Sequence, residues 1–107
     1  MLYYRHIFKT LNKFQLSYVI VGGIAVNLHG YDRLTGDIDI AISLTDVEIG
    51  KFIKAAKELS LVPRVPVRLE DFLDPVKREE WIQEKNMKVF SVYNPKNAIE
   101  HIDVMIT

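Results

Sequence analysis

The chain has 107 residues and no cysteine, and its 14 basic and 14 acidic residues give a formal net charge of zero. This length fits one domain spanning residues 1–107. The lack of cysteine excludes disulfides, thiolate metal sites and cysteine nucleophiles, and the balanced charge argues against a global basic field for nucleic acid. With no signal-peptide core and no apolar run near the ~20 residues that span a bilayer, we expect a cytoplasmic domain without membrane contact.

The first half of the chain alternates between helical and strand patterns. Apolar residues at helical spacing predict a helix over residues 2–14. A β-branched and aromatic run predicts a buried strand at 18–21, which stops at two glycines. A short helix is expected over 24–29, and strict alternation predicts a strand over 37–42 with one apolar face.

A helix is expected to begin after Thr45 and to run to about Ser60. Thr45 and Glu48 have the spacing of a capping box, which marks a helix N-terminus. The expected buried side of this helix consists of Val47, Phe52, Ala55, Ala56 and Leu59.

The segment 63–72 has two prolines and mixed polarity, and its pattern predicts no element. After it, Asp74 followed by Pro75 is typical of an N-cap and a first helical position. The pattern predicts a helix over 74–85 that turns Trp81 inward.

The end of the chain reads as two strands, residues 88–93 and 99–106, joined by a turn at 94–97. The whole order of elements predicts an α+β fold, a mixed β-sheet with helices packed on it. If the final strand lies exposed at the sheet edge, dimerisation through it is expected.

Three carboxylates are the candidate functional residues. Asp37 and Asp39 are two apart on a predicted strand, so they face the same side. Asp103 lies opposite the apolar face of the final strand, together with His101 and Met105. If the two strands are neighbours, Asp103 joins the first two acids. The alternative is that these aspartates merely decorate a solvated strand face.

Three oxygen ligands of this kind suit two Mg²⁺ or Mn²⁺ ions rather than zinc. Two such ions activate a hydroxyl and neutralise a leaving pyrophosphate.

Gly22-Gly23 follows the first predicted strand and opens a helix, where backbone N–H groups favour phosphate. Arg33 lies four residues before Asp37, and two roles are equally expected for it. It binds a phosphate, or it forms an ion pair with Asp37 or Asp39 when no metal is bound. His101 is a weaker candidate for contact with the site.

These residues together resemble the signature of the polymerase β-like nucleotidyltransferases. The matching strings are Val21-Gly22-Gly23, Asp37-Ile38-Asp39-Ile40 and Ile102-Asp103-Val104. The wider strings 22–30 and 33–39 look like small prokaryotic nucleotidyltransferases that include the AbiEii type of toxin.

The resemblance implies a nucleotidyltransferase core and the transfer of a nucleoside monophosphate from an NTP to a hydroxyl acceptor on RNA, protein or a small molecule. It implies that Gly22 and Gly23 hold the triphosphate, that Asp37 and Asp39 bind both metals, and that Asp103 binds one metal and helps to deprotonate the acceptor. No Arg-Arg-Asp motif is present, which disfavours the CCA-adding branch.

Such enzymes usually carry a helical region after the third acid, and here four residues follow Asp103. The resemblance therefore leaves two expectations open. Either a partner subunit supplies that region, or the chain is a shortened or catalytically weak member. The alternative function is a non-catalytic, antitoxin-like module that works with a partner protein.

Overall fold

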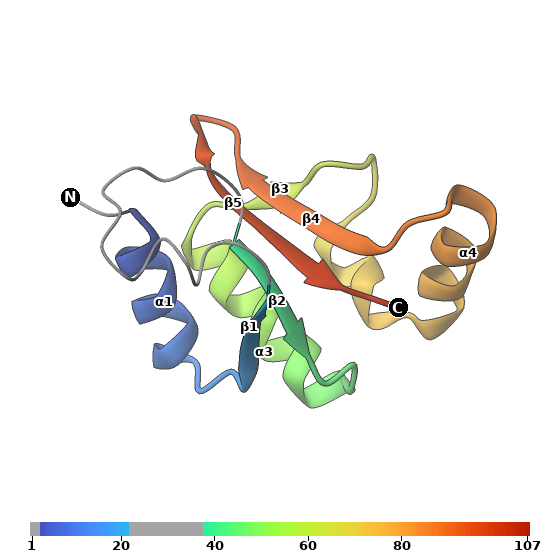
Figure 1. Cartoon of the computed structure of the whole chain (residues 1–107), viewed down its shortest axis with the longest axis horizontal. Coiled ribbons are helices and arrows are strands. Elements are labelled where there is room, and N and C mark those ends of the chain that lie inside the picture. The colour runs from blue at the N-terminus through green and yellow to red at the C-terminus, as the bar shows by residue number, and fades with distance from the viewer. Residues whose placement is uncertain (1–2, 22–37) are drawn as a thin grey trace.

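A five-stranded mixed sheet lies at the centre of the computed structural model, which describes residues 3–21 and 38–107 (Figure 1). Its strands are β1 (Tyr18–Val21), β2 (Ile38–Ile42), β3 (Val62–Pro63), β4 (Val89–Asn94) and β5 (Asn97–Met105). They lie in the order β1-β2-β5-β4-β3, with β2 and β5 parallel and the other neighbours antiparallel. The predicted α+β class with a mixed sheet is confirmed.

The final strand is the middle strand of this sheet. It pairs with β2 on one side and with β4, its hairpin partner, on the other. The expectation that it forms an exposed edge suited to dimerisation is therefore wrong. Local patterns predicted the β4–β5 hairpin, but the insertion of β5 beside β2 depends on contacts between distant parts of the chain. Among the described strands, β1 and β3 are the edges.

In the described ranges, three α-helices and one 3₁₀ helix accompany the sheet: α1 (Tyr3–Lys13), α3 (Asp46–Glu58), η1 (Leu69–Leu73) and α4 (Pro75–Lys85). Ile7 and Leu11 of α1 and Phe52 of α3 are fully buried in the same apolar core as the inward side chains of the strands. In Figure 1, α1 and α3 lie against one face of the sheet. Within the described residues, no helix is long and apolar enough to span a membrane.

The N-terminus of α3 has the predicted cap, but one residue of its predicted buried side is exposed. The Thr45 hydroxyl accepts a hydrogen bond from the Glu48 N–H at 3.2 Å, as the pattern predicted. The Glu48 carboxylate instead accepts from the Ser17 N–H at 2.9 Å, which ties the helix to the segment before β1. Val47 is 67 % exposed, so its predicted burial is wrong. Ile49 takes the inward position instead, because it lies three residues before Phe52 and so shares its face of the helix.

Segment 63–72, which the sequence left unassigned, contains the end of β3 and most of η1. It contributes Phe72 to a line of aromatic rings that crosses the core. Phe72 stacks on Phe90 at 4.5 Å between ring centroids and meets Phe52 edge-on at 5.9 Å. Trp81 also stacks on Phe90, at 5.3 Å between ring centroids, and its burial confirms the predicted inward position in α4. The expected helix at 24–29 lies outside the described residues.

Candidate carboxylate site on the sheet

The two faces of the sheet differ sharply in chemistry. Ile38, Ile40, Ile102 and Val104 are fully buried on the face that packs against the helices. Because side chains alternate along a strand, the intervening residues point to the opposite face. We call this opposite face the site face, and its central side chains are Val21, Asp39, Ser91, Tyr93, His101 and Asp103.

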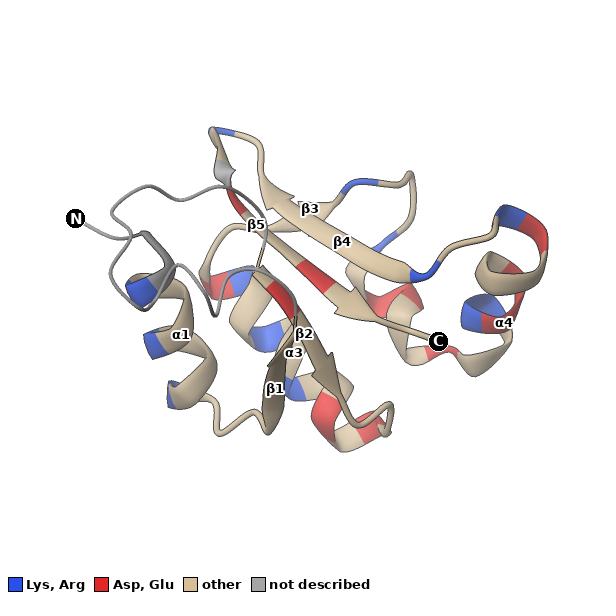
Figure 2. Ribbon diagram, viewed as in Figure 1, with Lys and Arg blue, Asp and Glu red and all other residues tan. Residues whose placement is uncertain are grey.

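Asp39 and Asp103 are direct partners across the parallel β2–β5 pair. Neighbouring strands lie about 4.8 Å apart, so the two carboxylates start from adjacent backbone positions. The row continues to Val21 on β1 and to Ser91 on β4. Figure 2 shows acidic positions side by side on β2 and β5 in the middle of the sheet. The two strands are neighbours, which is the condition under which Asp103 was expected to join the other acids, while the role of these aspartates as metal ligands stays a prediction.

Asp37, Gly22, Gly23 and Arg33 lie outside the described residues. In the parts of the chain that are described, no group of three or more His, Asp or Glu side chains is arranged to hold a metal. The described portion of the site therefore consists of two carboxylates of the predicted three.

Asp103 takes part in a chain of hydrogen bonds on the site face. Its Oδ1 atom accepts a hydrogen bond from the Ser91 hydroxyl at 2.5 Å and lies 2.6 Å from Nε2 of His101. The other ring nitrogen of His101, Nδ1, accepts from Nε of Arg64 at 2.9 Å. The guanidinium of Arg64 also lies over the ring of Tyr93, 4.2 Å from its centroid. His101, weighed as a possible site residue from its strand position, thus contacts Asp103.

The direction of these bonds follows from the chemistry of arginine. A guanidinium has donors and no acceptor, so Nδ1 of His101 has to be the acceptor and carries no proton. The proton of the neutral ring then lies on Nε2, which donates to Asp103. Both nitrogens of His101 are engaged, and its side chain is 7 % exposed.

This arrangement argues against two other kinds of chemistry. In a nucleophilic triad the histidine lies between serine and aspartate, whereas here Asp103 lies between Ser91 and His101. A histidine that ligates a metal needs a free nitrogen lone pair. In His101 the Nδ1 lone pair accepts from Arg64 and Nε2 donates to Asp103. The set suits oxygen-ligand chemistry at the aspartates.

Arg64 and Ser91 were not predicted as site residues from the sequence. Ser91 lies on the strand predicted over 88–93, but only the register of the β4–β5 hairpin shows that it pairs with Asp103. Arg64 lies in the unassigned segment, where it follows β3, and its N–H donates to the Ser91 carbonyl at 3.0 Å. This bond extends the alternation of the sheet by one residue and directs the Arg64 side chain to the site face.

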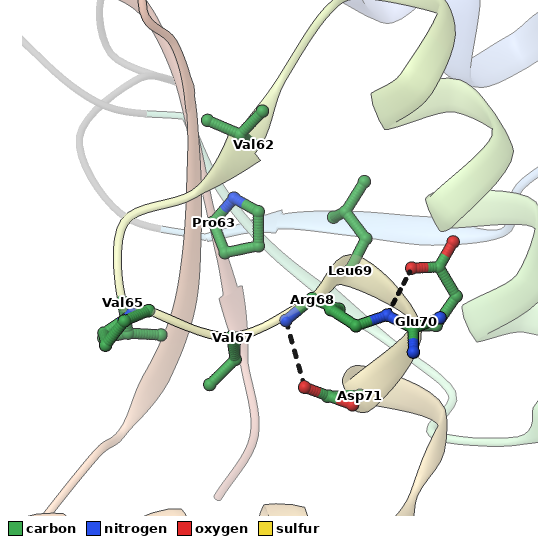
Figure 3. Close-up of a pocket in the computed structure, with 9 residues that line it drawn as sticks. Val62, Pro63, Val65, Val67, Arg68, Leu69, Glu70 and Asp71 are labelled. Carbon is green, nitrogen blue, oxygen red and sulfur yellow. Dashed lines mark hydrogen bonds and ion pairs between the residues drawn. The ribbon is translucent and has the colours of Figure 1, made fainter.

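A separate pocket lies between β3 and η1 (Figure 3). Its polar groups are engaged with each other: the Arg68 N–H donates to Asp71 at 3.0 Å, and the Arg68 guanidinium lies 3.7 Å from Glu70. The remaining walls are apolar, so this pocket offers no converging polar groups for a substrate. Its lining consists of Val62, Pro63, Val65, Pro66, Val67, Arg68, Leu69, Glu70 and Asp71.

Comparison with models of known protein families, with curated proteins and with solved structures finds no match for this chain. The resemblance described above therefore depends on the residues of the chain itself, and the geometry of the site face is the basis on which a function is proposed.

Proposed function

We propose that this chain is a metal-dependent nucleotidyltransferase, which transfers a nucleoside monophosphate from an NTP to a hydroxyl acceptor and releases pyrophosphate. The observation that supports the proposal is the register of Asp39 opposite Asp103 on one face of the sheet. Adjacent ionised carboxylates repel each other, and a shared divalent cation removes that repulsion. Asp37, two residues before Asp39, supplies the third carboxylate of the motif.

The donor set fits Mg²⁺ or Mn²⁺. Carboxylate oxygens are the ligands that these hard cations prefer, while zinc favours nitrogen and sulfur. The chain has no cysteine, and both nitrogens of His101 are engaged with Arg64 and Asp103. Asp39 and Asp103 would hold the ions together with Asp37. When bound, two such ions polarise the phosphoryl oxygens and stabilise the charge on the leaving group.

In the proposed reaction, the acceptor oxygen forms a bond to the α-phosphorus of the NTP. The bond from that phosphorus to the oxygen that bridges to the β-phosphorus breaks, and pyrophosphate leaves with the electron pair. Asp103 takes the proton of the acceptor hydroxyl. Gly22 and Gly23 are proposed to cradle the triphosphate through backbone N–H groups, and Arg33 to bind a phosphate oxygen.

A second candidate function is a non-catalytic module that uses the same site face to bind a partner. One observation favours it: Oδ1 of Asp103 is already satisfied by Ser91 and His101, so this aspartate has hydrogen-bond partners without any cation. In this alternative the Asp103 carboxylate stabilises the sheet through its hydrogen bonds and binds no metal. The two functions differ in whether NTP binds in a metal-dependent way.

The test is calorimetric titration of NTP into the chain with Mg²⁺, with Mn²⁺ and with a chelator. The wild type is compared with Asp39→Asn and Asp103→Asn, which remove one charge at nearly constant shape. Asp46→Asn is the matched control because Asp46 is exposed in the first turn of α3. Circular dichroism checks that each variant is folded.

If the proposal holds, NTP binds only with metal, both site variants lose binding, and Asp46→Asn keeps it. Pyrophosphate release on addition of an RNA or small-molecule acceptor would then extend the result to turnover. If NTP fails to bind the folded wild type under every metal condition, the nucleotidyltransferase proposal is wrong and the binding-module function is favoured.

A further inference from the structure

Four side chains from three parts of the chain form a continuous hydrogen-bonded line on the site face. It runs from Arg64, after β3, to His101 and Asp103 on β5, with Ser91 of β4 at the far end. The donor–acceptor distances are 2.9, 2.6 and 2.5 Å. Both hydrogen bonds to Asp103 go to the same oxygen, Oδ1. Among the described residues, none donates a hydrogen bond to Oδ2.

The line is anchored at the Arg64 end. The guanidinium of Arg64 lies 4.2 Å from the centroid of Tyr93, a cation–π contact that limits its orientations. Tyr93 and His101 are partners in the β4–β5 register, so the arginine and the imidazole are held by adjacent positions of one hairpin. Arg64 in turn fixes the tautomer of His101, because it donates to Nδ1 and leaves the proton on Nε2.

We propose that Arg64 and His101 are positioning residues, which hold the Asp103 carboxylate with Oδ1 engaged and Oδ2 available as the ligand oxygen of a divalent cation. This inference rests on the proposed function, since it assumes that Asp103 binds metal. The physical basis is that a ligand whose other oxygen is fixed by a buried donor loses little rotational freedom when it binds. Neither residue is proposed to touch the metal or the substrate.

The experiment measures the affinity of the full chain for Mn²⁺ alone, by electron paramagnetic resonance of the free ion. Wild type is compared with Arg64→Gln and with Arg68→Gln. The second variant is the matched control, because Arg68 lies four residues further along, is 77 % exposed in its side chain and pairs with Glu70 at the surface. Both substitutions remove one positive charge, and Arg64 itself is exposed, so its replacement does not threaten the fold.

The sign of the effect separates positioning from simple electrostatics. Removal of a positive charge near two carboxylates should strengthen cation binding if charge alone matters. Loss of positioning should weaken it, by about 10- to 100-fold as for other residues that orient metal ligands. We expect Arg64→Gln to weaken Mn²⁺ binding and Arg68→Gln to change it by about twofold or less, because surface charges are screened.

A second pair of variants tests His101 directly. His101→Gln keeps an amide donor that can reach Asp103, while His101→Leu removes it and leaves Asp103 without that partner. We expect the glutamine variant to retain more Mn²⁺ affinity than the leucine variant at comparable melting temperature. ¹⁵N NMR of the metal-free wild type adds a readout that does not depend on metal, and it should show His101 protonated on Nε2.

The outcomes distinguish a failure of the positioning role from a failure of the proposed function. Unchanged or tighter Mn²⁺ binding by folded Arg64→Gln, or a His101 ring protonated on Nδ1, overturns the positioning role and leaves the proposed function standing. A wild type that binds neither Mn²⁺ nor metal–NTP overturns both.

Discussion

Asp39 and Asp103 occupy directly opposite positions on two parallel strands, although α3, β3, η1, α4 and β4 all lie between them in the chain. The carboxylate pair therefore exists only when β5 is inserted between β2 and β4. A contact of this kind makes the site a property of the complete sheet, so changes in the core that shift β5 should affect the site as well.

The first prediction concerns the coupling of these two aspartates. If they share a cation, either Asp39→Asn or Asp103→Asn should remove most of the Mn²⁺ affinity, and the double variant should lose little more. Such non-additivity is expected for groups that act as one unit. The measurement is a double-mutant cycle on Mn²⁺ affinity at constant ionic strength. Strictly additive losses would mean that the two carboxylates bind separate ions or none in common.

The second prediction concerns the line of rings that joins η1 and α4 to the sheet. Phe72 is fully buried and stacks on Phe90 at 4.5 Å. Phe72→Leu keeps an apolar side chain but loses the ring contacts, so we expect a loss of about 1–2 kcal/mol in the free energy of unfolding. Val76→Ala is the control, because Val76 is 68 % exposed, and it should change stability by about 0.5 kcal/mol or less.

Urea unfolding at neutral pH measures both effects. If Phe72→Leu costs no more than Val76→Ala, the stacked rings contribute no stability beyond ordinary burial, and another contact must hold η1 against β4.

The fold was predictable where the sequence pattern is local. Thr45 and Asp74 cap their helices as predicted, because a cap depends on neighbouring residues, and the alternation around Ile102 and Val104 identifies the buried face of β5. The strand order was not predictable, since no local pattern places β5 beside β2. Val47 was wrongly placed on the buried side of its helix because it lies five residues before Phe52, which is off the face that three- and four-residue spacings form.

The residues of the candidate site also separate into those that local patterns predict and those that depend on tertiary structure. Asp39 and Asp103 follow from strand alternation, and the structure adds that they are partners. Arg64 was not predicted as a site residue because it lies in an irregular segment. Its side chain reaches the site face only because its backbone N–H pairs with Ser91 and extends β3 by one residue. His101 was seen on the correct face, but its two partners are a tertiary feature that no spacing in the sequence encodes.

The third prediction concerns the end of α3. The Leu61 N–H donates to the Ala56 carbonyl and the Ser60 N–H to the Lys57 carbonyl, which is the Schellman arrangement. It places Ser60 at φ 61°, a left-handed conformation that glycine adopts without strain. Ser60→Gly should therefore raise the free energy of unfolding by about 0.5–1 kcal/mol. Ser60→Ala is the control and should give no gain, so equal stabilisation by both variants in thermal unfolding would contradict the explanation.

The fourth prediction concerns how the free energy of unfolding depends on pH below neutrality. Hydrogen bonds from Lys51 and from the Ser17 N–H hold the pKa of Glu48 below its usual 4.5. A depressed pKa in the folded state means that the stabilisation is complete above the unfolded pKa and is lost as the pH falls through the folded value. The stability difference between wild type and Glu48→Gln should thus be largest above about pH 5 and shrink toward about pH 3.

Chemical unfolding of both proteins across this pH range measures the difference. Lys51→Gln removes the largest cause of the pKa shift, so the pH-dependent difference should shrink when Glu48→Gln is made in that background. A gap that stays constant from about pH 6 to about pH 3 would show that Glu48 acts through hydrogen bonding that does not depend on its charge, because only an ionised carboxylate loses its stabilising contribution on protonation.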